Sequence, residues 1–189
     1  VGSEMCIRDR TEVERRCGIC LSDPLIYEAF TYYDREILPY KNDDVINAHA
    51  MPGAHAALQA VQDAGLRCAL FTNPSFPQGA IECRMGWGDL ADAPFELVTH
   101  MGNATRCKPD ATYYLEQLQA MGLEPHEVLM VGNDPKRDFP SPACGIQTAY
   151  VGQGKPGLAT WRGTMEDFAR DFNAVVEAFY EHQVADELS

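Results

Sequence analysis

The most informative stretch of this chain of 189 residues is VLMVGNDPKRD, residues 128–138. Its first four residues are apolar and the run stops at Gly-Asn-Asp, which is typical of a short buried strand that ends in a turn. In parallel sheets, ligands bind just beyond the carboxyl ends of the strands. Asp134 and Asp138 follow such an end, and carboxylates are ligands that Mg²⁺ prefers. Taken alone, the stretch fits equally well an Asx-rich turn that only stops a strand.

Segments with the patterns of strands and helices alternate from Pro52 onward. We expect strands at Arg67–Phe71, Phe95–Thr99, Val128–Val131 and Gln147–Val151. We expect helices from Pro52 to Gly65, over Pro77–Trp87, Pro109–Met121 and Phe139–Cys144, and from Thr164 onward, where Asp167 completes a variant of the capping box. Strands separated by helices predict a parallel α/β sheet.

The first 50 residues have a different pattern. Residues 11–50 contain short clusters of apolar residues, and Pro24 and Pro39 mark the boundaries of two or three short helices. Met5–Arg10 reads as the translation of a sequencing adapter fused to the broken end of an assembled read. We therefore treat residues 1–10 as an artefactual leader, and we expect natural sequence before Thr11 to be missing.

Composition limits the classes of partner. Apolar residues make up 46% of the chain, enough to bury a core. The net charge of −13 argues against nucleic acid, whose phosphates need a basic surface. No apolar run approaches the roughly 20 residues of a membrane span. Seven cysteines, an odd number without a disulfide-like spacing, favour a reducing compartment. We expect a cytoplasmic protein with a small-molecule substrate and no membrane or nucleic-acid partner.

Two further segments carry groups that suit an anion. Thr72-Asn73 ends the strand expected at 67–71, where a hydroxyl, an amide and free backbone N–H groups can hold phosphate oxygens. Lys108-Pro109 precedes a helix, where an ammonium group can neutralise a phosphate or a carboxylate. Each has an ordinary alternative, an Asx turn in the first case and a solvated lysine in the second. The helix dipole disfavours a cation at a helix start, which favours a specific reason for Lys108.

The order of these segments resembles that of the haloacid dehalogenase-like (HAD) hydrolases. Thr-Asn follows a strand, Lys-Pro comes about 35 residues later, and Gly-Asn-Asp-x-x-x-Asp about 25 residues after that. The matching stretches are residues 70–74, 107–110 with Tyr113-Tyr114, 129–138 and 145–148. The resemblance covers roughly residues 52–152, and its strength lies in the three motifs together rather than in any one.

The resemblance implies a Rossmann-like, three-layer parallel sheet with a helical cap. By this resemblance, residues 11–50 are a cap remnant, 51–160 the α/β core, and 161–189 a C-terminal helix that packs on the core. It also implies an aspartate nucleophile that is transiently phosphorylated while Mg²⁺ balances the charge. Such a reaction brings anions together, so cations and hydrogen-bond donors must offset their repulsion.

The family likeness also assigns roles to particular residues. Thr72 and Asn73 would bind the transferring phosphoryl group, and Lys108 would bridge the nucleophile and the phosphate. Asp134 and Asp138, with Asn133, would hold the metal directly or through water. The implied activity is that of a Mg²⁺-dependent phosphatase acting on a small phosphorylated metabolite.

The sequence departs from the family pattern at two places. The first motif, Asp-x-Asp-x-Thr at the end of the first strand, is absent, and Asp23 is a poor substitute because no convincing strand precedes it. We therefore expect the printed chain to be inactive. Asn133 stands where many relatives carry a metal-binding Asp. Two alternatives stay open: a metal-independent dehalogenase of the same superfamily, and a non-catalytic binding module that keeps the sheet.

Overall fold

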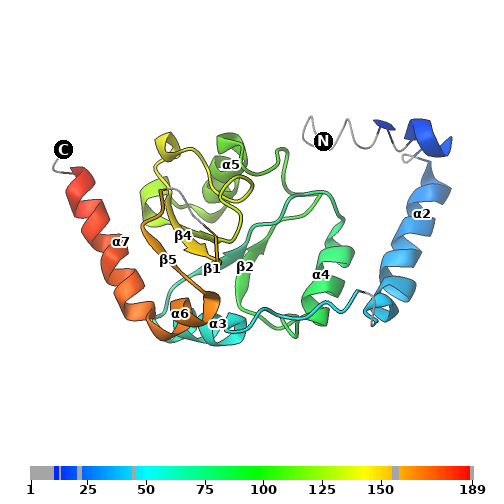
Figure 1. Cartoon of the computed structure of the whole chain (residues 1–189). Coiled ribbons are helices and arrows are strands. Elements are labelled where there is room, and N and C mark those ends of the chain that lie inside the picture. The colour runs from blue at the N-terminus through cyan, green and yellow to red at the C-terminus, as the bar shows by residue number, and fades with distance from the viewer. Residues whose placement is uncertain (1–10, 13, 21–22, 44–45, 155–157, 188–189) are drawn as a thin grey trace. The chain divides into compact units, whose positions relative to one another are not determined.

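The structure is a computed structural model, and Figure 1 shows its helices and strands coloured from the N-terminus to the C-terminus. It describes residues 11–12, 14–20, 23–43, 46–154 and 158–187, with side chains up to residue 183. The adapter-like residues 1–10 lie outside this described part. The chain divides into two compact units, one formed by residues 1–50 and 69–107 and the other by residues 51–68 and 108–189.

The first unit combines a two-stranded sheet with helices. Strands β1 (Cys68–Leu70) and β2 (Phe95–Val98) are hydrogen-bonded neighbours, and helix α4 (Gln78–Trp87) lies between them in the sequence. Helix α4 packs against two consecutive short turns, the π-helical η1 (Tyr33–Ile37) and the 3₁₀-helical η2 (Leu38–Lys41). The N-terminal residues 33–41 of this unit therefore pack against α4.

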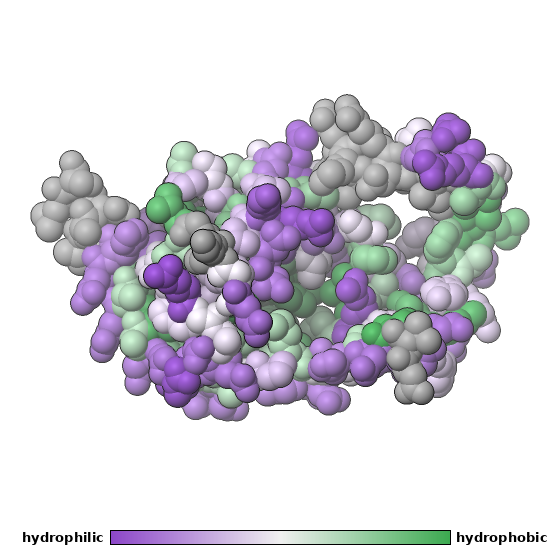
Figure 2. Space-filling view, in the orientation of Figure 1, coloured by the Kyte–Doolittle hydropathy of each residue, from purple (hydrophilic) through white to green (hydrophobic). Residues whose placement is uncertain are grey.

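Helix α2 (Pro24–Tyr32) precedes η1 and begins where the sequence predicts. The Asp23 carboxylate accepts a hydrogen bond of 2.9 Å from the Leu25 N–H, and Pro24 occupies the first turn, where its missing N–H costs nothing. None of the α2 residues is buried, although the helix carries large apolar side chains such as Leu25 and Phe30. Figure 2 shows this apolar surface along the blue helix at the right of Figure 1.

The second unit is built on a parallel sheet in the order β3 (Leu129–Gly132), β4 (Gln147–Val151) and β5 (Trp161–Gly163). Gly132 of β3 is in register with Tyr150 of β4, which is in register with Arg162 of β5. All five residues of β4 are buried, as expected of a strand with a neighbour on each side.

Helices pack against this sheet and complete its core. Helix α3 (Ala54–Asp63) packs against α6 (Met165–Arg170), and α7 (Phe172–Glu187) follows α6 (Figure 1). Gly53, with φ of 84°, begins α3 at a point where a Cβ atom would lie 2.6 Å from the backbone nitrogen of Glu166, so no larger residue fits there. One hydrophobic cluster of this core consists of the buried residues Ala57, Ala149, Val151, Phe168, Phe172 and Val175.

Helix α5 (Ala111–Met121) brings aromatic side chains into the second unit. Its buried residues are Tyr113, Tyr114, Gln117 and Leu118, a single face at helical spacing. Asp110 caps its start by accepting the Thr112 N–H at 2.8 Å. Gly122, in the left-handed region with φ of 65°, ends it as the sequence predicts.

The prediction of a mixed α/β fold with parallel strands is confirmed, and so are the four expected strands, within a few residues at their ends. The structure differs in three places. The helix expected over Phe139–Cys144 is reduced to a single 3₁₀ turn, η4 (Pro142–Cys144). Residues 161–163, assigned from sequence to a C-terminal helical segment, form strand β5. The helix expected from Thr164 onward is interrupted at Asp171, so that α6 and α7 are separate. In the described part of the chain, no helix is long and apolar enough to cross a membrane.

Candidate functional site

The turn after β3 is organised by Asp134. Its Oδ1 atom accepts hydrogen bonds from the backbone N–H groups of Lys136 (3.0 Å) and Arg137 (3.3 Å). Its backbone carbonyl accepts the N–H of Asp138 at 2.7 Å. The Asx turn considered from the sequence is thus present, and it returns the chain so that a second carboxylate meets the end of the strand.

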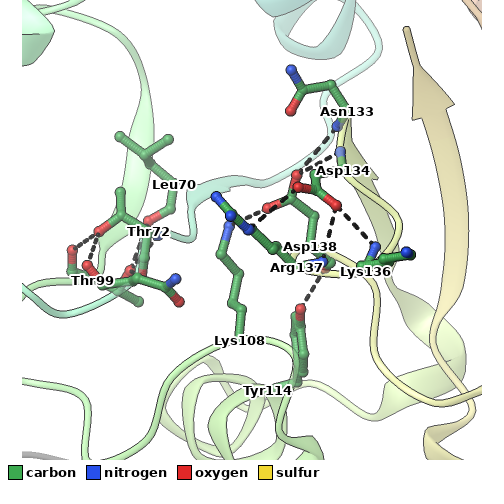
Figure 3. A network of polar contacts seen from close by, with 11 residues as sticks. Leu70, Thr72, Thr99, Lys108, Tyr114, Asn133, Asp134, Lys136, Arg137 and Asp138 are labelled. Carbon is green, nitrogen blue, oxygen red and sulfur yellow. Dashed lines mark hydrogen bonds and ion pairs between the residues drawn. The ribbon is translucent and has the colours of Figure 1, made fainter. Parts of the chain in front are cut away.

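That second carboxylate belongs to Asp138 and is surrounded by donors (Figure 3). Its Oδ2 atom accepts the backbone N–H groups of Asn133 at 3.2 Å and Asp134 at 3.0 Å. Its Oδ1 atom lies 2.7 Å from Nζ of Lys108. Only 11% of the Lys108 side chain and 16% of the Asp138 side chain are exposed. Charge-assisted hydrogen bonds of this kind, shielded from water, fix the orientation of both groups.

Gly132 makes this arrangement possible. A Cβ atom at Gly132 would lie 2.7 Å from Cβ and 3.0 Å from Oδ2 of Asp138, closer than side chains approach one another. The last residue of β3 must therefore be glycine for the Asp138 side chain to fold back over the strand end. The Gly in the Gly-Asn-Asp motif has a steric role here, beyond ending the strand.

Lys108 reaches Asp138 from the segment that leads into α5. It lies two residues before the Asp110 cap, next to Pro109, to which it is joined by a cis peptide bond. The positive end of the α5 dipole disfavours a cation at this place, and the Asp138 carboxylate offsets that cost. The structure thus brings two of the predicted site residues, 30 positions apart in the sequence, into direct contact.

Tyr114, a residue quoted in the family motif but not assigned a role from sequence, contacts the same site. Its hydroxyl donates a hydrogen bond to the backbone carbonyl of Asp138 (Figure 3). Burial raises the pKa of Tyr114 far above its ordinary value, so its hydroxyl stays protonated and can donate. One feature of the sequence could have indicated this role for Tyr114. It is a tyrosine on the apolar face of a helix, where a phenylalanine would fill the same space without a hydroxyl.

Thr72 and Asn73 lie in the first unit, at the end of β1, in a network of their own. The Thr72 N–H donates to Oγ1 of Thr99 at 2.6 Å, and the Thr72 hydroxyl donates to the Thr99 carbonyl at 2.9 Å. The Asn73 carbonyl accepts the Ser75 N–H at 2.8 Å, so the backbone turns at Pro74. In this arrangement, the Thr72 hydroxyl must rotate away from Thr99 before it can donate to a phosphate oxygen.

Thr99 is a second residue that the sequence did not single out. It is completely buried at the end of β2, and its own N–H donates to the Leu70 carbonyl at 3.0 Å. Its hydroxyl and carbonyl both bind Thr72, so it fixes the backbone at the strand end that precedes Asn73. The one feature of the sequence that could have indicated this role is that Thr99 is a threonine at the last position of an expected strand.

The carboxylate oxygens at the end of β3 suit a hard cation. Asp138 Oδ1 accepts one hydrogen bond, and Asp134 Oδ2 has one long ion pair, of 3.6 Å, with the exposed Arg137. Both oxygens therefore keep capacity for a ligand, and Mg²⁺ commonly takes one or two carboxylates and completes its shell with water and phosphate. Asn133 joins the network through its backbone rather than its side chain (Figure 3). Among the described residues, no group of three or more His, Cys, Asp or Glu side chains is arranged around a common point.

Comparison with known proteins supports the resemblance drawn from the motifs. The sequence pattern of the haloacid dehalogenase-like hydrolases matches residues 21–144. The phosphoglycolate phosphatase of Rhodospirillum rubrum is 30% identical over 120 residues, which cover 64% of this chain and 48% of that protein. The chain thus spans about half the length of this relative.

Two solved structures share the fold over most of the chain. A β-phosphoglucomutase from Clostridium difficile has a TM-score of 0.59 and 16% identity, with 84% of this chain and 67% of that one covered. An L-2-haloacid dehalogenase has a TM-score of 0.52 and 18% identity, with 87% and 68% covered. At such identities the two structures show the fold alone.

The matched region contains all three motifs: the strand end at Thr72, the segment with Lys108, and the turn that carries Asp134 and Asp138. It extends over well more than half of the chain. The chain therefore belongs to the haloacid dehalogenase-like hydrolases.

Proposed function

We propose that this chain is part of a Mg²⁺-dependent phosphatase that hydrolyses a small phosphorylated metabolite through an aspartyl-phosphate intermediate. The observation that carries the proposal is the ion pair of 2.7 Å between Lys108 and Asp138 at the start of α5. It keeps an ammonium group, shielded from water, at the strand end where ligands of parallel sheets bind. The named activity of the Rhodospirillum rubrum relative supports the choice of phosphatase.

The chemistry explains why such a cation is needed. A carboxylate oxygen attacks phosphorus, so that a new O–P bond forms and the bond from phosphorus to the substrate's alcohol oxygen breaks. Water then hydrolyses the acyl phosphate, which releases inorganic phosphate and restores the carboxylate. The first step brings two anions together. Lys108, a compact point charge, would offset this repulsion, and Thr72 and Asn73 would bind the phosphoryl oxygens.

The metal would share this task. When bound, Mg²⁺ supplies positive charge that polarises the phosphoryl oxygens and stabilises the transition state. Asp134 and Asp138 would hold it, with Asn133, directly or through water. The hydrogen bonds from the Asn133 and Asp134 N–H groups to Asp138 keep that carboxylate oriented in advance.

The nucleophile is proposed to lie upstream of Thr11. The chain contains no Asp-x-Asp sequence. In the family, the strand that carries this motif lies in the middle of the sheet, and the described strands here form two separate sheets instead of one. We accordingly propose a Rossmann-like, three-layer sheet for the restored protein. In it, residues 51–160 form most of the core, residues 161–189 pack on that core, and residues 11–50 are part of a helical cap.

The rival within the superfamily is a metal-independent dehalogenase. It is favoured by Asn133, which is not acidic at a position where a metal-binding Asp is common. The fold does not distinguish a phosphatase from a dehalogenase, because a haloacid dehalogenase shares it. Asp134, next to Asn133, keeps a carboxylate oxygen available and favours the metal-dependent reaction. A non-catalytic binding module is the alternative from a different class.

The test uses the gene with its genomic sequence upstream of the Thr11 codon restored. The longer protein is assayed for phosphate release from p-nitrophenyl phosphate and phosphoglycolate, and for halide release from 2-chloropropionate, with Mg²⁺ and with EDTA. We expect phosphate release that EDTA abolishes, and no p-nitrophenyl phosphate hydrolysis by the printed chain. Halide release in EDTA would show a dehalogenase. A native start codon near Thr11, with neither activity, would leave the binding module.

A further inference from the structure

We propose that Tyr114 is a positioning residue for Asp138, holding the main chain of this residue so that its carboxylate points at Lys108. The proposal rests on the proposed function, in which Asp138 serves the metal. The Tyr114 hydroxyl donates a hydrogen bond to the Asp138 backbone carbonyl, while the Asp138 carboxylate contacts Lys108 at 2.7 Å. Tyr114 would never touch substrate or metal, and it would act only through Asp138.

The surroundings of Tyr114 explain why a hydroxyl is present. The side chain is completely buried on α5, and its ring packs edge-to-face against Tyr113 with ring centres 5.2 Å apart. A buried hydroxyl is costly unless it forms a hydrogen bond, and a phenylalanine would supply the same apolar contacts without that cost. The hydrogen bond to the carbonyl of Asp138 gives this hydroxyl a structural reason to be present.

The α5 segment thus holds Asp138 at two points (Figure 3). Lys108, just before the helix, binds the side chain, and Tyr114, in its first turns, binds the main chain. These two contacts add to the hydrogen bond of 2.7 Å from the Asp138 N–H to the Asp134 carbonyl within the turn. With both in place, the Asp138 Oδ2 atom remains against the N–H groups of Asn133 and Asp134, at 3.2 and 3.0 Å.

The experiment compares Tyr114→Phe with wild type in the full printed chain, by amide hydrogen exchange followed by NMR. The readouts are the Asn133 and Asp134 amides, whose protection depends on the position of Asp138. We expect their exchange to be about tenfold faster in Tyr114→Phe, as expected for one buried hydrogen bond. Exchange of the Ala149 and Val151 amides, in β4, should change much less. Tyr113→Phe, an equally buried ring one residue away, is the matched control and should leave Asn133 and Asp134 unchanged.

A role in packing alone predicts a different pattern. It would speed exchange at Ala149 and Val151 as much as at Asn133 and Asp134, or Tyr113→Phe would have the same effect as Tyr114→Phe; either result overturns the proposal. Because no turnover is measured, these results stand or fall separately from the phosphatase activity of the restored protein.

A measurement on wild type decides the case if Tyr114→Phe does not fold. The ¹³Cζ signal of Tyr114 is recorded in an equal mixture of H₂O and D₂O. A hydroxyl held on the Asp138 carbonyl exchanges slowly and gives two resolved signals, one for OH and one for OD. Tyr180, which is 53% exposed, serves as the control and gives one averaged signal. A single averaged signal for Tyr114 as well would overturn the proposal.

Discussion

Gly132 illustrates how closely the end of β3 and the Asp138 side chain are packed. The atom that alanine would add lies 2.7 Å from Cβ of Asp138, an atom fixed to the backbone that cannot simply swing aside. Any side chain at this position must therefore move the turn that carries Asp134 and Asp138. The geometry of the candidate metal ligands depends on the absence of a single methyl group.

Replacing Gly132 with alanine should consequently lower the free energy of unfolding by about 1 to 3 kcal/mol, the usual cost of overpacking. Urea denaturation measures the change. Gly86→Ala in α4 is the control, because a Cβ there meets nothing within 4 Å, and helix propensity predicts a gain of up to about 1 kcal/mol. Equal stability of wild type and Gly132→Ala would mean that Asp138 does not occupy the described position.

Thr99 provides a second test at the level of one residue. Thr99→Val keeps the shape of the side chain but removes the acceptor of the Thr72 N–H, and an unsatisfied buried donor costs about 1 to 3 kcal/mol. Thr148→Val is the matched control, since this buried threonine donates one long hydrogen bond of 3.3 Å. We expect thermal and urea unfolding to show the larger loss for Thr99→Val. Equal losses would remove Thr99 from its role in fixing Thr72.

Among the elements, those with long periodic or apolar patterns could be predicted from the sequence, because their own residues determine them. The strand at 128–131 and the helix that ends at Gly122 are examples. Strand β5 could not be predicted in this way. It has only three residues, and its pairing with the buried β4 determines its conformation. The contacts of Thr99 and Tyr114 were equally inaccessible, because their partners lie 27 and 24 positions away.

Helix α6 permits a prediction about pH. Its capping box, predicted at Thr164 and Asp167, is present. The backbone N–H of Thr164 donates to the Asp167 carboxylate and, together with the Thr164 hydroxyl and Arg170, holds the pKa of Asp167 below its usual range. A lowered folded-state pKa stabilises the protein above the unfolded value of about 3.9, and this contribution is lost as the pH falls through the folded value.

The difference in urea midpoint between wild type and Asp167→Asn should therefore be constant at neutral pH and shrink below about pH 4, as the lowered pKa requires. Measurements at several pH values between about 7 and 2 would check this. A difference that stays constant down to the lowest pH, or that grows on acidification, would contradict the role assigned to the capping box.

The whole molecule is negatively charged, and so is the phosphate of the proposed substrate, but cations placed at the site can bind that phosphate. The net charge is −13, yet the phosphate of the proposed substrate needs only a few cations at one place. Lys108 is such a cation, and its pairing with Asp138 keeps it oriented while no substrate is bound. The candidate site residues were predicted from the sequence because each ends or begins a predicted element and matches a family motif. The direct contact of Lys108 with Asp138 could be seen only in the fold.

The proposed function requires Lys108 to act on the transferring phosphoryl group. Its most direct test is kcat/KM of Lys108→Ala in the length-restored protein, with Mg²⁺ and p-nitrophenyl phosphate. Loss of a positioned charge predicts a fall of ~100-fold or more, with a loss in unfolding free energy of about 2 kcal/mol from the broken bond to Asp138. Lys108→Arg should also be impaired, because a planar guanidinium does not replace a compact ammonium.

Lys136→Ala is the matched control for that measurement. It removes an equal charge from an exposed side chain in the turn after β3, and it should keep kcat/KM within about twofold of wild type. The proposed function predicts that Lys108→Ala loses its activity while Lys136→Ala does not. If Lys108→Ala instead keeps more than about half of the wild-type kcat/KM, a change of under ~0.5 kcal/mol in the barrier, Lys108 is not part of the reaction and the proposed function is contradicted.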